Sequence, residues 1–392
     1  MLRLMIFLSV VVTILVLGHV YIARRFSAGA DERVGRITKR VIYGQGLLIL
    51  CSMSARGVGS LGVGWQVPLQ WAGMLALGFF SLELVSLIAI DVGDWLRRKV
   101  RGLRGLENET DADRRALLLR PFRLGAMALT TAIGATGVRQ AYMAAEVVEV
   151  EIPIANLPPA LDGFRIAQVS DIHVGPTIRG SFLDRIVLRV NELEADMVAV
   201  TGDLVDGSVA SIGHDVEPIA GFKSRYGTYF ITGNHEYYAG AERWIEFLRS
   251  QGVTVLLNEH VVLQHDESQL LLAGVTDYRA GRQLEGHATD PEGAAAGAPP
   301  CPARVLLAHQ PRSAYAAAKT GAYDLQLSGH THGGQYVPFS WFINLFQPFA
   351  VGLHRHEGMW VYTNRGTGYW GPPIRTGVRP EITSLVLRRE TT

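Results

Sequence analysis

Residues 328–334 read Ser-Gly-His-Thr-His-Gly-Gly and follow Tyr323 to Leu327, a run in which apolar and polar residues alternate as they do along a β-strand. On an extended backbone His330 and His332 would point to the same side, because side chains two positions apart on a strand share a face. The flanking glycines let backbone and ligand approach closely. The stretch therefore predicts a site that two histidines build at the end of a strand.

Four upstream clusters of polar residues also stand directly after short apolar runs. The runs cover residues 164–169, 197–200, 228–231 and 304–307, and amphipathic helical stretches separate them. The clusters that close them hold Asp171 and His173, Asp203, Asn234 and His235, and His309. Strands that alternate with helices predict an α/β domain. Ligands in such domains gather beyond the carboxyl ends of the strands, so we expect all these side chains to converge.

The predicted ligand set combines imidazole, carboxylate and amide groups and contains no cysteine, which suits Zn, Mn or Fe. Its members are Asp171, His173, Asp203, Asn234, His309, His330 and His332. Seven side chains exceed what one tetrahedral zinc uses, but with a bridging carboxylate they fit two metals about 3.5–4 Å apart. Such a pair supports in-line displacement at phosphorus by a metal-activated water.

His235 follows Asn234 directly but would point in another direction, which leaves it free to protonate a leaving alkoxide. Each residue taken alone has a simpler explanation as a helix cap or a satisfied polar group, and a buried structural metal would explain several of them. The occurrence of all five clusters in order favours a catalytic centre.

Together the five clusters resemble the signature motifs of the calcineurin-like metallophosphoesterases. The motifs are Asp-x-His at 171–173, Gly-Asp at 202–203, Gly-Asn-His-Glu at 233–236, His309, and Gly-His-x-His at 329–332. The resemblance covers residues 164–388 and implies a four-layer α/β sandwich with two mixed sheets and two divalent metal ions. It implies that Asp171, His173 and His332 bind the first metal and that Asn234, His309 and His330 bind the second. Asp203 would bridge both, and His235 would be the catalytic histidine.

The first third of the chain is strongly apolar and predicts a membrane region before the α/β domain. Apolar runs cover residues 1–23, 41–53, 67–90 and 124–138, with a short break around Arg56. The first and third are long enough to cross a bilayer of about 30 Å, and the other two are weaker. A signal peptide is the alternative for the first run, although Arg24 and Arg25 follow it directly. We expect about four transmembrane helices in residues 1–145 and the catalytic domain in residues 146–392.

Basic residues are concentrated in residues 24–40 and 97–123, the segments that follow the first and third apolar runs. The positive-inside rule places both segments in the cytoplasm, so four spans would put residues 146–392 on the periplasmic or extracellular side. If these segments instead bind acidic lipid and one weak span is not real, the side is reversed. The net charge of +1 gives no reason to expect a nucleic-acid partner.

Residues 336–349 are far richer in aromatic side chains than the chain average of 9%. One interpretation is a lip that contacts acyl chains or enters the bilayer; the other is a loop that packs on the core. Residues 280–302, rich in Gly, Ala and Pro, are expected to form a surface loop.

The predicted function is a membrane-anchored two-metal phosphoesterase. It would hydrolyse a phosphomonoester or a phosphodiester by metal-activated water. The membrane region and the aromatic stretch suggest a lipid or cell-envelope phosphoester, with a nucleotide or a general phosphomonoester also open. The alternative is a non-catalytic membrane receptor or scaffold that uses the same fold for binding.

Overall fold

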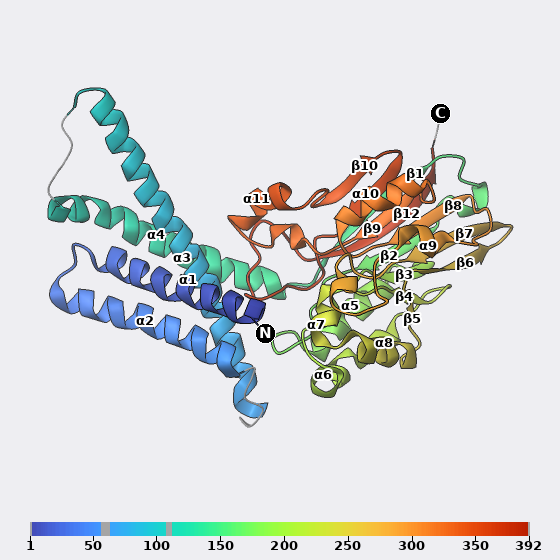
Figure 1. The fold of residues 1–392 in the computed structure, drawn as a ribbon, viewed down its shortest axis with the longest axis horizontal. Coiled ribbons are helices and arrows are strands. Elements are labelled where there is room, and N and C mark those ends of the chain that lie inside the picture. Colours follow the sequence, from blue (N-terminus) through green and yellow to red (C-terminus); the bar gives the residue numbers. More distant parts are fainter. Residues whose placement is uncertain (1, 56–62, 107–111, 391–392) are drawn as a thin grey trace. The chain divides into compact units, whose positions relative to one another are not determined.

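A computed structural model describes residues 2–55, 63–106 and 112–390 of the chain. The break expected around Arg56 lies outside these residues. The chain divides into two compact units, a helical unit of Met1–Arg139 with Gly371–Ile374 and an α/β unit of Gln140–Trp370 with Arg375–Thr392 (Figure 1).

The long helices of the amino-terminal third are α1 (Leu2–Ser27), α2 (Glu32–Ala55), α3 (Val63–Leu103) and α4 (Ala112–Tyr142). Over the described part of the chain, three segments are long and apolar enough to cross a membrane, namely Leu8–Ser27, Trp65–Leu103 and Arg114–Tyr142. The second predicted span lies in α2, which is not among them. The physical reason is that α2 carries four basic residues over positions 33–40, so its apolar part begins only at Val41.

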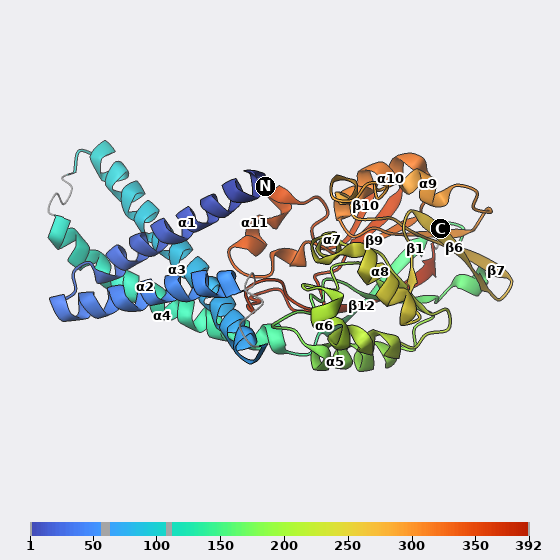
Figure 2. The same cartoon turned by 60° about the horizontal axis from the view of Figure 1, so that its bottom comes forward.

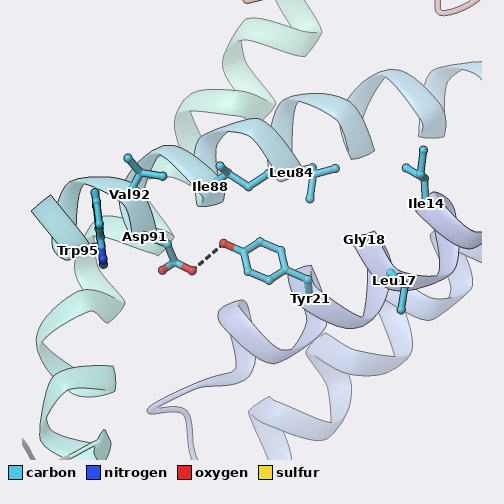
Figure 3. A pocket seen from close by; sticks show the side chains of 9 residues that line it. All are labelled: Ile14, Leu17, Gly18, Tyr21, Leu84, Ile88, Asp91, Val92 and Trp95. Carbon is cyan, nitrogen blue, oxygen red and sulfur yellow. Dashed lines mark hydrogen bonds between the residues drawn. The ribbon is translucent and has the colours of Figure 1, made fainter.

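Polar contacts join α1, α3 and α4 near one end of the helical unit. Asp91 of α3 accepts a hydrogen bond of 2.7 Å from the hydroxyl of Tyr21 and pairs with Arg25 at 2.6 Å and with Arg123 of α4 at 3.8 Å. Beside this cluster, Ile14, Leu17, Leu84, Ile88 and Trp95 contribute to an apolar groove of about 500 Å³ between α1 and α3 (Figure 3). The end of α1 therefore lies beside the beginning of α4.

The described strands of the α/β unit form two sheets of six strands each. The first sheet has the order β1 (Glu146–Ile154), β12 (Glu381–Arg389), β2 (Arg165–Val169), β3 (Met197–Val200), β4 (Thr228–Phe230) and β5 (Thr254–Val255). The second has the order β10 (Gly352–His356), β11 (Met359–Thr363), β9 (Leu325–Ser328), β8 (Ala303–Leu307), β7 (Ser268–Gly274) and β6 (Glu259–His265). Both are mixed, because β12 is antiparallel to β2 and β6 is antiparallel to β7, whereas β2, β3 and β4 are parallel to one another, as are β8 and β9.

Alternate residues of each strand build different layers of the core. Ile166 of β2 packs between the two sheets with Leu307 and Leu327, whereas Ala167 faces the helices on the outside of the first sheet. These helices are α5 (Gly180–Asn191), α6 (Val209–Val216) and α8 (Ala241–Ser250), and α9 (Pro291–Ala295) and α10 (Ala314–Thr320) cover the second sheet (Figure 2). This arrangement confirms the predicted four-layer α/β sandwich with two mixed sheets.

Residues 280–302 are not entirely a surface loop, so that expectation is partly wrong. Asp290 caps α9 by accepting a hydrogen bond of 2.9 Å from the backbone N–H of Gly293. Ala294 is fully buried in the outer core beside the second sheet. A short capped helix whose buried residues are Pro291 and Ala294 does not stand out in a segment rich in Gly, Ala and Pro.

Candidate metal centre

Every predicted ligand lies just beyond the carboxyl end of a parallel strand. Asp171 and His173 follow β2, Asp203 follows β3, His309 follows β8, and His330 and His332 follow β9. Asn234 and His235 follow β4 and open the short helix α7 (Asn234–Ala239). Because β2 to β4 belong to one sheet and β8 and β9 to the other, the centre is assembled from loops at the carboxyl ends of strands in both sheets.

Within the described residues, His and Asp side chains form three groups whose ligand atoms lie within 4.8 Å of one another. The groups are Asp171, His173 and His332; His173, Asp203 and His235; and Asp203, His309 and His330. Since His173 and Asp203 each belong to two groups, the three form one continuous centre. Asn234 is also buried, 9% exposed, in the loop after β4.

Five of the predicted ligands have backbones in the left-handed region, which side chains other than glycine rarely adopt. Their φ angles are 53° at Asp171, 57° at His173, 51° at Asp203, 73° at His330 and 49° at His332. Each costs of order 1–3 kcal/mol, and such residues cluster at functional sites. The expectation that His330 and His332 lie on extended backbone is therefore wrong. The turn after β9 sends the two imidazoles into different groups.

Two glycines are needed because the loops approach one another closely. A Cβ atom at Gly233 would clash with the carboxylate of Asp203, and one at Gly329 would clash with Ser170 and with the carboxylate of Asp171. The small residues beside the ligands thus let the strand-end loops meet.

Hydrogen bonds at Nδ1 orient two of the histidines. His309 donates from Nδ1 to the carbonyl oxygen of Thr201 at 2.8 Å, and the Nδ1 of His173 lies 3.1 Å from Oδ1 of Asp206. In the neutral ring both contacts hold the proton on Nδ1 and leave Nε2 able to bind a metal. For His309 this requires loss of a proton, because burial is outweighed by Asp203 and the neighbouring carboxylates, which raise its pKa well above its usual range. The Nε2 atom of His309 is 3.1 Å from Oδ2 of Asp203.

Asp206 was not singled out from the sequence, although it lies in the same loop as Asp203. Its Oδ1 atom accepts from Nδ1 of both His173 and His235, at 3.1 and 2.6 Å. Its position three residues after Asp203 is the only sequence signal, and it does not reveal that one carboxylate joins two histidines from other loops. Asp206 therefore positions one predicted ligand and the predicted catalytic histidine together.

His235 lies at the accessible side of the centre, with its side chain 14% exposed and its Nε2 atom 3.9 Å from Oδ2 of Asp203. Its ring makes edge contacts with Tyr238 and Trp370 at centroid distances of 5.3 and 5.6 Å. Burial opposes protonation, but the hydrogen bond to Asp206 and the nearby carboxylates raise the pKa of His235 to about 9. The imidazolium form is therefore present at neutral pH, and it can donate a proton from Nε2.

Burial and neighbouring charges keep the imidazoles of His330 and His332 neutral and the carboxylate of Asp203 ionised. Burial, followed by the charge of His309, lowers the pKa of His330 to about 3, and burial followed by His173 lowers the pKa of His332 well below its usual range. Burial disfavours the charged form of Asp203, but the charge and hydrogen bond of His309 together with the charges of His235 and His173 outweigh it and lower the pKa of Asp203 well below its usual range. Neutral imidazoles and an ionised carboxylate are the forms that bind a metal.

Glu236 ties the loops together, a role that the sequence did not suggest although the residue stands in a quoted motif. Its buried carboxylate accepts hydrogen bonds from the backbone N–H groups of Gly233, Asp203 and Leu204 at 2.7, 3.0 and 2.8 Å. Burial, followed by the charge of Asp203, raises the pKa of Glu236 to about 7.

The donor set fits a pair of divalent cations. Oδ1 of Asn234 is buried and has no hydrogen-bond partner among the residues that the structure describes, and the buried Nε2 of His309 has only its ion-pair contact with Asp203 there. A buried polar atom without a partner costs about 1–3 kcal/mol, and a bound cation would satisfy both atoms. Nitrogen and oxygen donors without thiolate suit Zn, Mn or Fe.

Comparisons with known proteins agree with this geometry. The family model described as calcineurin-like phosphoesterase matches residues 164–334. A zebrafish (Danio rerio) protein named transmembrane protein with metallophosphoesterase domain is 38% identical over 82% of this chain and 74% of its own length. A cattle (Bos taurus) protein of the same name is 39% identical over 70% of this chain and 64% of its own length. An uncharacterized metallophosphoesterase of Campylobacter jejuni is 32% identical over 74% of this chain and 75% of its own length.

Proposed function

The chain belongs to the calcineurin-like metallophosphoesterases, in a branch with relatives named as transmembrane proteins, and we propose that it is a membrane-anchored phosphoesterase with two divalent metal ions. The observation that carries this proposal is the position of Asp203, which belongs both to a group with His173 and to a group with His309 and His330. One carboxylate shared between neighbouring groups is the arrangement expected of a bridging ligand.

In this proposal the ligands divide between two sites. Asp171, His173 and His332 would hold one cation, Asn234, His309 and His330 would hold the other, and Asp203 would be shared between the two sites. Bound cations would neutralise the phosphoester and supply a nucleophilic hydroxide at neutral pH. The identity of the cations, Mn, Zn or Fe, remains a proposal that rests on the nitrogen and oxygen donors alone.

The chain's own residues supply the proton for the leaving group. Asp206 holds the ring of His235 through Nδ1, and the protonated Nε2 atom can donate to a leaving alkoxide. Glu236 fixes the loops that carry Asp203 and Asn234, so the ligands are held before substrate arrives.

The test is replacement of Asp203 by alanine or asparagine in the full-length protein. Both variants should lose hydrolysis of a generic aryl phosphate ester and should retain fewer metal ions, which elemental analysis of the purified protein measures. Wild-type activity in a metal-depleted Asp203→Ala variant would show the two-metal mechanism to be wrong.

We propose that the substrate is a phosphoester of a lipid or of the cell envelope. The membrane-capable helices of the same chain and the aromatic segment at 336–349 support this choice. Turnover of a lipid extract and of a phosphoester panel, by protein loaded with Mn or Zn, separates it from nucleotides and general phosphomonoesters. Turnover of none of them by protein with both metals bound would favour a non-catalytic receptor or scaffold.

We further propose that residues 1–145 cross the membrane four times and that residues 146–392 lie on the periplasmic or extracellular side. Two contacts near the end of α1 support this topology. Arg123 of α4 donates to the carbonyl oxygen of Arg25, at 3.4 Å, and the backbone of Gly29 lies beside Leu117. The end of α1 and the beginning of α4 therefore lie side by side, and both carry basic residues, Arg24 and Arg25 in α1 and Arg114 and Arg115 in α4, as two crossings between them require. Protease added to spheroplasts should cleave residues 146–392; protection from protease until lysis would place them inside.

A further inference from the structure

The helix α11 (Phe339–Phe346) presents apolar side chains to the outside of the α/β unit. None of its eight residues, all of which the structure describes, is buried. Trp341, Leu345 and Phe346 are 71, 77 and 72% exposed, and the helix lies outside the stacked layers (Figure 1). A surface helix of a globular domain ordinarily turns a polar face to water. The interpretation of residues 336–349 as a loop that packs on the core is therefore wrong for α11, although Tyr336 is buried and Phe349 packs against the outer core of the second sheet.

The segment around α11 also lacks charge. Residues 336–353 contain no Asp, Glu, Lys or Arg. Full burial of one large apolar side chain contributes about 1.5–3 kcal/mol, so leaving several of them in water is costly. Contiguous exposed apolar surface of this kind marks a site of interaction with a protein or a membrane.

The surroundings hold α11 in a defined position. Arg312 donates to the carbonyl oxygen of Phe346 and to Oε1 of Gln347, both at 3.1 Å, and so fixes the end of the helix. At its start, a Cβ atom at Gly334 would lie 2.5 Å from Cα of Ser340, so the first turn packs against the turn that carries His332. The exposed helix α11 therefore packs directly against the turn that carries a predicted metal ligand.

A membrane is close to the α/β unit because of the length of chain between them. The membrane-capable part of α4 ends at Tyr142, and β1 begins at Glu146. The three residues between them span at most about 10 Å. A lipid surface is therefore tethered within reach of the α/β unit, whereas a second copy or another protein would have to be recruited.

We propose that α11 lies in the lipid interface of the membrane that anchors the chain. Trp and Phe side chains suit this position, because amphipathic and aromatic rings settle at the level of the headgroups. Two further exposed aromatic side chains, Tyr238 and Trp370, lie against His235, so exposed aromatic surface is also present beside the centre. Docking of α11 brings the centre to lipid headgroups, and the substrate is then a phosphoester that stays in the bilayer. This last step rests on the proposed function; the docking itself does not.

Spin labelling of the full-length protein in phospholipid nanodiscs tests the docking without an activity readout. Leu345→Cys carries the label in a background of Cys51→Ser and Cys301→Ser, and Glu267→Cys is the control. Glu267 lies in the β6–β7 turn, at the amino end of β7 and hence at the edge opposite the metal centre. The label at 345 should collide with dissolved oxygen more than with a water-soluble nickel chelate, and the label at 267 should do the reverse.

Two results would overturn the docking. A label at 345 that is as accessible to the nickel chelate as the label at 267 would show that α11 is in water. A label shielded from both reagents, with line broadening between labels, would show that a second copy of the chain covers the helix.

Activity measurements test the consequence for substrate. Leu345→Glu should lower kcat/KM for a vesicle-embedded lipid phosphoester about tenfold or more and leave a soluble aryl phosphate unaffected, whereas Leu345→Met should change neither. Equal loss on both substrates would contradict the proposal, because it would assign α11 to the fold of the centre. If wild-type protein with both metals hydrolyses neither substrate, the proposed function fails, while the labelling result still decides whether α11 docks.

Discussion

In the proposed mechanism His235 acts on the leaving group without holding a metal; Asp206 anchors its Nδ1 atom, and its side chain is partly accessible. We predict that His235→Gln lowers kcat by about 10²–10⁴ and leaves the metal content unchanged, because general-acid catalysis contributes about that factor. Hydrolysis of an aryl phosphate together with elemental analysis measures both. His214→Gln, at an exposed side chain on α6, is the matched control and should behave as wild type. Loss of metal from the His235 variant would reassign it as a ligand.

His330 and His332 are two positions apart but belong to different ligand groups. We predict that His332→Gln weakens the site formed with Asp171 and His173, and that His330→Gln weakens the site formed with Asp203 and His309. Each variant should retain about one metal ion where wild type binds two. Calorimetric titration of metal into metal-free protein gives the number of ions that each variant binds. If either single variant loses both ions at once, the sites do not fill separately.

Asp277 is a fully buried carboxyl group close to the centre, and Gln310 and the backbone N–H of Arg279 donate to it at 2.8 and 2.9 Å. Burial raises the pKa of Asp277, although the charge of His309 opposes the rise. Because the folded state then favours the protonated form, this group's contribution to stability is full below its unfolded pKa of about 3.9 and falls as pH rises through the folded pKa.

We therefore predict that Asp277→Asn gains stability relative to wild type as pH rises from acidic to neutral. Unfolding curves of both proteins, measured in chelator from pH 4 to 8, give the difference at each pH. Parallel curves would show that Asp277 titrates no differently in the folded and unfolded states.

At the scale of elements, α3 holds a carboxylate that three arginines surround. The side chain of Asp94 is 1% exposed and pairs with Arg97, Arg98 and Arg115 at 2.9, 3.2 and 2.6 Å. The arginines are partly exposed and stay hydrated without it, so we predict that Asp94→Ala destabilises the helical unit by about 1.5–3 kcal/mol through the loss of charge-assisted hydrogen bonds.

Thermal unfolding of the full-length protein in detergent measures this effect. Glu32→Ala is the control, because Glu32 is 84% exposed and pairs only with Arg36 along α2 among the described residues. An exposed pair of this kind contributes about 0.3–0.5 kcal/mol. Similar effects from both variants would show that the Asp94 cluster does not hold α3 to α4.

For the whole molecule, metal binding should stabilise the α/β unit because the ligands converge only when the strand-end loops are folded. We predict that a chelator lowers the Tm and that added Mn or Zn restores it. A cation at a thousand times its Kd contributes about 4 kcal/mol per site, and a domain of this size shifts by roughly 2–4 °C per kcal/mol. Melting curves of wild type and Asp203→Asn check this, since the variant should lose most of the dependence. An unchanged Tm in wild type would contradict the proposed centre.

The sequence by itself determined the fold class, the family and the positions from which the centre is built. Apolar runs that alternate with helical stretches predict the strands of an α/β domain, and the carboxyl ends of parallel strands adjoin because the strands share a direction. The structure accordingly places Asp171, His309 and His332 after β2, β8 and β9. Long apolar runs predicted the membrane region as well, because the length and composition of a segment can be read directly from the sequence.

Only the tertiary structure decided how these pieces meet. The left-handed backbone at His330 and His332 is imposed by the turn after β9, and no local pattern records it. The pairing of Asp206 with histidines from two other loops joins residues up to 33 positions apart. The exposure of α11 depends on what packs against it, and an apolar helix has the same sequence whether a core or a lipid surface covers it. In each case the deciding interaction is between segments distant in the chain, which the order of residues does not express.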